Sequence, residues 1–152
     1  MYKSGNQIGQ ETVQNPASVH PVTSPLTGQV IGEVSYADPA MIDRAVAKAR
    51  EAQRQWAQLT YKKRREVLFA MRQQLQAHED ELAQIITQEN GKSLAESRAA
   101  VAKAIELCKF AVSCPALISG KTEIVRTANK VKELTYPVGV LDCITPINVP
   151  LM

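Results

Sequence analysis

The sequence is poor in aromatic residues, cysteine and histidine, and it contains no long apolar run. Of its 152 residues, 5% are aromatic, three are cysteines and two are histidines. An odd number of cysteines with no Cys-x-x-Cys pair argues against a disulfide framework or a zinc site and favours a reducing compartment. No stretch approaches the length of a membrane span, and the amino terminus lacks the apolar core of a secretory signal. We therefore expect a cytoplasmic protein with no metal site and no membrane contact.

The charge is low and thinly spread, which bears on the possible partners. The formal net charge is +3, and the one basic run, Lys62 to Arg65, opens an amphipathic segment in which Tyr61 is the only nearby aromatic residue. A solvated helix face explains this run better than a nucleic-acid patch. The length suits one domain with a core of its own.

The first half of the chain predicts a hairpin followed by helices. Residues 1–21 are rich in Gln, Asn, Ser and Gly, so we expect them to be frayed. From Val22 to Tyr36 a turn signal separates two alternating stretches, which predicts an edge β-hairpin. Asp38 then has the form of an N-cap before a helix whose apolar face includes Trp56, which we expect to be buried in the core. A second helix begins near Thr60.

The second half predicts two more helices, a β excursion and a buried strand. A helix that carries Leu82, Ile85 and Ile86 ends at Gly91, and Ser93-Leu-Ala-Glu96 has the form of a capping box for a long helix that stops before Pro115. Two short alternating strands are expected around residues 123–126 and 131–135. The apolar run from Val138 to Ile144 is typical of a strand buried in a parallel sheet.

A rigid loop follows this strand and holds the most informative residue of the chain, Asn148. Pro146 and Pro150 each fix a backbone dihedral angle and bias the preceding residue toward extended geometry, so the backbone of Asn148 is clamped. A polar amide at the carboxyl end of a buried strand lies where open α/β sheets bind ligands. The alternative is structural, because Asn between prolines is also a common turn composition.

The motif series as a whole resembles the aldehyde dehydrogenase superfamily. Pro-Val-Gly-Val-x-x-x-Ile-Thr-Pro-x-Asn-x-Pro, from Pro137 to Pro150, is similar to that family's strand and loop, although Ile147 and Val149 stand where aromatic residues are usual. The Asp-Pro helix with its Ala-rich stripe and the segment Glu89-Asn-Gly-Lys92 also match. The likeness runs from about Val22 to Met152. Within the superfamily, the sequence most resembles the branch that includes methylmalonate-semialdehyde dehydrogenase.

The resemblance implies an α/β fold, the amino-terminal part of the aldehyde dehydrogenase fold. It also implies an oligomerisation role for the β excursion, and therefore a homo-oligomer when the protein is full length. It divides the chain into a flexible arm, the hairpin and helices of the cofactor-binding domain, the β excursion, and the first strand and loop of the cofactor-binding sheet: 1–21, 22–120, 121–136 and 137–152.

The same resemblance implies the chemistry, which is the oxidation of an aldehyde to an acid or an acyl-CoA with NAD or NADP. Asn148 matches the family's oxyanion-stabilising amide, and Thr145, Pro146 and Ile147 match positions that line the cofactor. The nucleophilic Cys and the general-base Glu lie further along in the family, so we expect these 152 residues alone to be inactive. Cys108, Cys114 and Cys143 are interpreted as inert thiols.

A competing hypothesis is a non-enzymatic helical binding or assembly module derived from such a dehydrogenase. It would keep the hairpin, the helices and the β excursion while lacking the chemistry.

Overall fold

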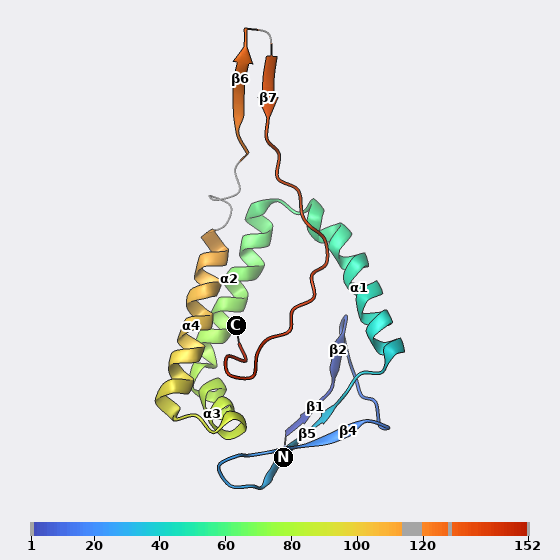
Figure 1. Cartoon of the computed structure of the whole chain (residues 1–152), viewed down its shortest axis with the longest axis vertical. Helices are drawn as coiled ribbons and strands as arrows, with labels where there is room; N and C mark the ends of the chain where they lie inside the picture. Colours follow the sequence, from blue (N-terminus) through green and yellow to red (C-terminus); the bar gives the residue numbers. More distant parts are fainter. Residues whose placement is uncertain (1, 114–119, 128, 152) are drawn as a thin grey trace.

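The computed structural model describes residues 2–113, 120–127 and 129–151. Figure 1 shows strands at one end, helices in the middle and a projecting hairpin at the other end. The strands are β1 Tyr2–Ser4, β2 Asn6–Ile8, β3 Glu11–Val13, β4 Val19–Thr23, β5 Val30–Ser35, β6 Thr122–Arg126 and β7 Asn129–Lys132. The helices are α1 Pro39–Gln58, α2 Tyr61–Ala77, α3 Glu79–Asn90 and α4 Leu94–Ser113.

The amino-terminal residues are ordered into strands, so the prediction of a frayed arm over residues 1–21 is wrong. Strand β1 pairs in parallel with β5, with Tyr2 opposite Gly32, while β2 and β3 form their own antiparallel pair. The Asn6 side chain donates to the Ser35 carbonyl at 2.9 Å. The partners in the β1–β5 pair and in the Asn6–Ser35 hydrogen bond are distant in sequence, and a polar composition does not reveal pairing of that kind.

The predicted hairpin between Val22 and Tyr36 is confirmed. Strands β4 and β5 pair antiparallel, and β5 lies between β4 and β1 in a three-stranded sheet. The turn closes where the Gly28 N–H donates to the Ser24 carbonyl at 2.8 Å. Gly28 has a φ of 69°, a left-handed value that glycine adopts without steric cost.

Helix α1 begins after the predicted N-cap Asp38, and α2 begins after Thr60, near which it was expected to start. The Asp38 carboxylate accepts from the Met41 N–H at 2.7 Å, and the Thr60 hydroxyl accepts from the Lys63 N–H at 3.4 Å. The apolar stripe of α1 has little cover, however, and none of its residues is buried. Trp56 is 37% exposed, so its predicted burial in the core is wrong. The stripe is amphipathic as expected, but within the described chain α1 packs chiefly against β2.

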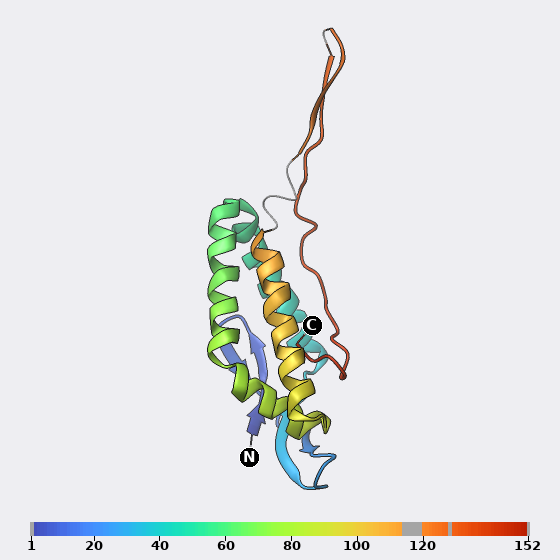
Figure 2. The same ribbon diagram turned by 90° about the vertical axis from the view of Figure 1, so that its left-hand side faces the viewer.

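The core lies in the packed group of α2, α3 and α4, which Figure 2 shows side by side. Ala83, Ile86 and Val101 form its buried cluster. Helix α3 ends at Gly91, which has a φ of 75°, as predicted. The predicted capping box is also confirmed, because Glu96 Oε2 accepts from the Ser93 N–H at 3.0 Å while the Glu96 N–H donates to Ser93 Oγ at 3.3 Å.

The predicted β excursion is confirmed as the antiparallel pair β6–β7, with Glu123 opposite Val131. It projects away from the helices in both ribbon views (Figures 1 and 2). All of its described residues are exposed, including Ile124 at 71%.

The chain then returns from β7 past the helices as residues 133–146, and none of these residues is in a strand. The prediction of a buried strand from Val138 to Ile144 is therefore wrong for this chain, since those two residues are 90% and 93% exposed. A strand of a parallel sheet needs neighbours on its edges and cover on both faces, and these residues have no ladder partner among the described strands. The architecture is nevertheless the mixed α/β arrangement that was expected.

Candidate functional site

The loop that holds Asn148 forms a turn at the end of the returning segment. The Val149 N–H donates to the Pro146 carbonyl at 3.1 Å, and Pro146 and Pro150 bound the turn as expected. Asn148 is exposed, as are Thr145, Pro146 and Ile147. The structure thus holds the four predicted site residues on one accessible loop.

Two contacts fasten this loop to the helical core. The Lys92 ammonium, just after the end of α3, donates to the backbone carbonyl of Asn148. Leu151 packs against the cluster of Ala83, Ile86 and Val101. Figure 1 shows the carboxyl-terminal loop beside these helices. The helical core therefore positions the loop, although the segment that leads into it is unpaired.

Sequence reasoning missed both of these anchors. Lys92 directly follows a helix-ending glycine, a position typical of a structural turn, and no sequence signal gives Leu151 a role. Lys92 and Asn148 are 56 positions apart, and no local pattern links residues at such a separation.

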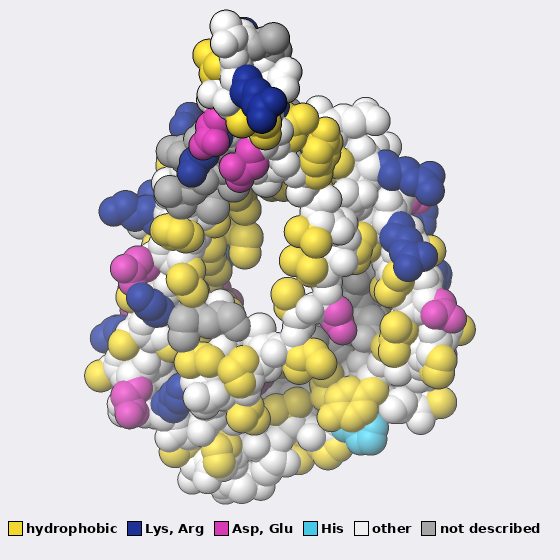
Figure 3. Space-filling model, turned by 45° about the horizontal axis from the view of Figure 1, so that its top comes forward, with side chains coloured by type: hydrophobic (Ala, Val, Ile, Leu, Met, Phe, Trp, Pro, Cys, Tyr) yellow, Lys and Arg dark blue, Asp and Glu magenta, His cyan; other side chains and the backbone are white. Residues whose placement is uncertain are grey.

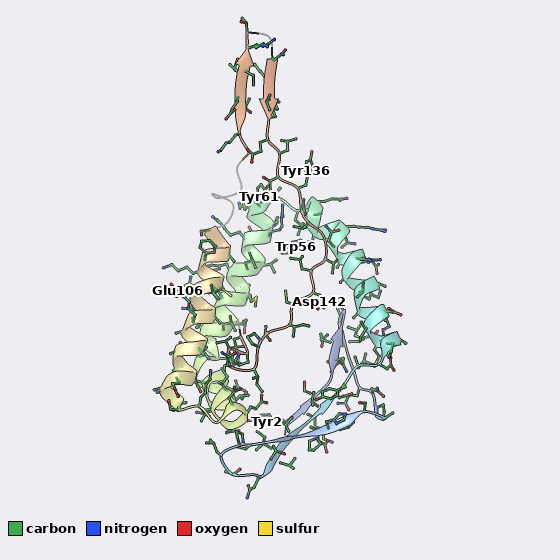
Figure 4. All side chains as sticks on the ribbon, viewed as in Figure 1. Tyr2, Trp56, Tyr61, Glu106, Tyr136 and Asp142 are labelled. Atoms are coloured by element: carbon green, nitrogen blue, oxygen red, sulfur yellow. The ribbon has the colours of Figure 1, made fainter. Side chains whose placement is uncertain are left out.

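A large cavity lies near the returning segment but does not include the loop. It has a volume of about 770 Å³, and its lining comes from α1, β2 and residues 139–142. Its wall on α1 is the uncovered apolar stripe, with Ile42 and Val46 among its residues. Figure 3 shows an opening through the middle of the molecule with hydrophobic side chains around it. In Figure 4, Asp142 lies on the returning segment, which runs between α1 and the helices α2 and α4 in this view, whereas Glu106 lies on the outer side of α4.

The titratable groups with shifted pKa values lie outside this loop. The Ser93 hydroxyl and N–H lower the pKa of Glu96, with a smaller effect from the Lys92 charge. The Lys103 ammonium lowers the pKa of Glu106, both as a hydrogen-bond donor and as a nearby charge. Both carboxylates are solvent-exposed and serve a helix cap or an ion pair along a helix. They show no sign of catalytic tuning.

The cysteines and acidic residues give little sign of other chemistry. Cys108 is partly buried in α4. Cys143 is exposed, so its predicted burial inside a strand is wrong, and Cys114 lies outside the described residues. Within residues 2–113, 120–127 and 129–151, no group of His, Cys, Asp and Glu could hold a metal ion. Within the same ranges, no helix is apolar enough over a sufficient length to cross a membrane.

Comparison with protein families gives one match over most of the chain. Residues 12–152 match the model of the "Aldehyde dehydrogenase family". A malonate-semialdehyde dehydrogenase of Listeria innocua is 38% identical over 99% of this chain, which corresponds to 31% of that protein. One of Lacticaseibacillus casei is 39% identical over 86% of this chain and 27% of its own length. The chain thus spans about a third of the length of these relatives.

Solved structures give the same result. A structure described as a putative methylmalonate-semialdehyde dehydrogenase from Sinorhizobium meliloti 1021, complexed with NAD, aligns with a TM-score of 0.91 and 29% identity. It covers all of this chain and 31% of its own. An "NADP dependent enzyme" of Escherichia coli aligns with a TM-score of 0.78 at 26% identity, over 84% of this chain and 27% of its own.

Proposed function

The chain belongs to the aldehyde dehydrogenase family, and from this premise we propose that it contributes the oxyanion-binding loop of an enzyme that oxidises an aldehyde with NAD or NADP. The observation that carries the proposal is the exposed Asn148 on a loop fastened to the helical core. The amino-terminal β strands, the helices and the β excursion would form the scaffold around that loop. The domain boundaries at residues 120 and 136 remain part of this proposal, whereas the boundary at residue 21 does not, because it falls within strand β4.

In the proposed reaction a cysteine thiolate from the part of the enzyme beyond this segment adds to the aldehyde carbon. The carbonyl oxygen gains negative charge as the carbon–sulfur bond forms. The role of this chain is then to offer the Asn148 side-chain N–H as a hydrogen-bond donor to that oxygen. A donor placed where charge develops stabilises the transition state more than the bound substrate.

The nicotinamide cofactor would accept the hydride that leaves the carbon, which turns the adduct into an acyl group that passes to water or coenzyme A. Thr145, Pro146 and Ile147 are the residues of this chain that would line the cofactor. All three are exposed beside Asn148, so a nucleotide could pack against them, and their backbone would make the contact. One structural neighbour was solved with NAD and another is described as NADP-dependent, so the proposal includes either cofactor.

The names of the relatives suggest the substrate class. Proteins described as malonate-semialdehyde dehydrogenases match 99% of this chain, and we extend to it the proposal of a small semialdehyde substrate. The β6–β7 pair, exposed along its whole described length, would pair with another subunit in a homo-oligomer. We place the enzyme in the cytoplasm because its cysteine usage suits a reducing compartment.

The proposal can be tested with a chimeric dehydrogenase, in which residues 1–152 replace the matched segment of the Listeria innocua relative. The chimera should oxidise malonate semialdehyde, whereas the 152 residues alone should not. In the chimera, Asn148→Ala should lower kcat by roughly 10²–10³-fold with little change in the cofactor Kd, as for the loss of other oxyanion donors.

Asn148→Asp is the matched control, because aspartate has the same shape and also suits a Pro-bounded turn. It replaces the donor with an acceptor, so kcat should fall at least as far as in Asn148→Ala. If Asn148 only braces the turn, Asn148→Asp would retain most of the activity, and Asn148→Ala would weaken cofactor binding and thermal stability together. An inactive parent chimera would count against the proposed function itself.

A further inference from the structure

The Lys92 ammonium donates a hydrogen bond to the Asn148 carbonyl, a contact that has no direct part in the proposed chemistry. The Val149 N–H, on the other side of the same peptide group, donates to the Pro146 carbonyl at 3.1 Å. The peptide group between Asn148 and Val149 is therefore held at its oxygen by Lys92 and at its nitrogen by Pro146. A planar unit held at both ends fixes the backbone dihedral angles on either side of it.

The surroundings of Lys92 favour a cation at a defined place. Lys92 follows Gly91, the residue that ends α3, and the carboxyl-terminal end of a helix attracts positive charge. Gly91 lies close to Pro25, since a Cβ added there would be 3.0 Å from Pro25 Cγ. The Lys92 charge also acts on the carboxylate of Glu96 in the first turn of α4. The base of the lysine side chain is thus anchored between two helices.

The far end of the loop is held independently. Leu151 packs on the cluster of Ala83, Ile86 and Val101, so the segment from Pro146 to Leu151 is bound to the core at two points. Leu151 restrains the position of the loop as a whole, whereas Lys92 acts on the peptide group adjoining the Asn148 side chain. The Lys92 contact is therefore the one that acts directly on the backbone from which the side-chain amide extends.

We propose that Lys92 is a positioning residue that aims the Asn148 side-chain amide at the developing oxyanion. This inference rests on the proposed function. A misplacement of about 1 Å in a reacting group can cost as much as 10²-fold in rate, so a lysine that touches neither substrate nor cofactor can still control turnover. Lys92 would act entirely through Asn148, and this makes the inference testable.

The test uses four variants of the chimeric dehydrogenase. Lys92→Met keeps the length of the side chain and removes its charge and donors, and it should lower kcat by about 10- to 100-fold with an unchanged cofactor Kd. Lys92→Arg restores a cationic donor and should recover most of the activity. Lys48→Met removes a lysine that pairs with Glu51 on α1, away from the loop, and should have no effect. In Lys92→Met/Asn148→Ala, the lysine change should add nothing to the loss caused by Asn148→Ala, because the amide that it aims is gone.

An active chimera in which Lys92→Met has normal kcat would overturn the inference and leave the proposed function standing. The inference would also be overturned if Lys92→Met lowered kcat by the same factor in the parent chimera and in the Asn148→Ala chimera, since an equal loss would indicate a general structural defect. An inactive parent chimera removes the proposed function and the inference with it. If Lys92→Met fails to fold in the chimera, the contact can be followed by NMR in the 152-residue chain. There, Lys92→Met should speed hydrogen exchange at the Val149 amide while Lys92→Arg does not, and equal exchange in both variants would contradict the contact.

Discussion

The α3–α4 pair and the segment of residues 133–146 are both apolar enough to belong in a core, yet only the helices contain buried residues. Ile86 in α3 is 5% exposed, whereas Ile144 in the returning segment is 93% exposed. The helices satisfy their own backbone hydrogen bonds and need only one neighbour to cover an apolar stripe. A strand needs neighbours for its hydrogen bonds as well as cover for its faces. Apolar sequence therefore leads to burial here only where the partner lies in the same segment of chain.

Helix α1 is an intermediate case between these two regions. It forms where its cap predicts, but its apolar stripe lines an open cavity of about 770 Å³ together with residues 139–142. The two uncovered apolar surfaces thus face the same space. In the proposed full-length enzyme, the rest of the cofactor-binding sheet would cover both of them.

The largest effect should come from truncating the same side chain in the two regions. Ile86→Ala removes buried atoms and should lower the unfolding free energy of the α3–α4 pair by about 2–5 kcal/mol. Ile144→Ala removes atoms already in water and should change it by less than about 0.5 kcal/mol. Amide hydrogen exchange of α4 measures both values in the 152-residue chain.

The chimeric dehydrogenase tests whether this difference between Ile86 and Ile144 persists when the partners of the segment are present. If residues 138–144 become a buried strand there, Ile144→Ala should also cost about 2–5 kcal/mol in the chimera. A cost that stays near zero would mean that the segment remains outside the sheet, and the proposed place of this chain in the enzyme would be wrong.

A smaller difference in stability should appear between alanine substitutions at Gly91 and Gly139. Both glycines have positive φ values, 75° for Gly91 and 114° for Gly139. Gly91→Ala forces a left-handed conformation on alanine and brings its Cβ to 3.0 Å from Pro25 Cγ, so it should destabilise the helical core by about 1–2 kcal/mol. Gly139 has open space around it and lies in a segment without ladder hydrogen bonds. The backbone of that segment can therefore change its dihedral angles to accommodate the alanine of Gly139→Ala. The urea midpoint of the helical circular dichroism signal should fall for Gly91→Ala alone, and equal shifts would show that residues 133–146 are held more firmly than their exposure indicates.

The sequence predicts well the features that depend on neighbouring residues. Asp38, Thr60, Gly91 and the Ser93–Glu96 box mark helix ends through contacts within about four positions, and all four signals are confirmed. The turn at Asn148 was predictable for the same reason, because its two prolines act on adjacent residues.

The errors involve pairing between distant residues. Strand β1 depends on β5, the Lys92 contact spans 56 positions, and Trp56 on α1 remains 37% exposed. Periodicity identifies which face of an element is apolar, but it does not identify what covers that face. The oxyanion role of Asn148 came from the family resemblance and stays a prediction.

The smallest expected effect is a pH dependence of stability that arises at the start of α4, within the helical core. The Ser93 hydroxyl at 2.7 Å and the Ser93 N–H at 3.0 Å both donate to Glu96 Oε2, and they lower the pKa of Glu96 in the folded chain. In the unfolded chain the pKa returns to its ordinary value of about 4.3. Between the two values the unfolded state binds more protons, so stability rises with pH across that window.

The contribution of Glu96 is thus complete above the ordinary pKa of glutamate and is lost as the pH falls through the lowered value. Glu96→Gln isolates it, because glutamine can still accept a hydrogen bond from Ser93 but does not titrate. The urea midpoint of the helices should be higher for the native chain than for Glu96→Gln near neutral pH, and the two should converge once the pH has fallen below the lowered pKa of Glu96, where both side chains are uncharged. Taking the difference cancels the titration of the other carboxylates, which both proteins share. A difference that grows as the pH falls would reverse the sign of the argument and show that the capping box holds a protonated glutamate, whereas a constant difference would mean that the charge of Glu96 does not stabilise α4.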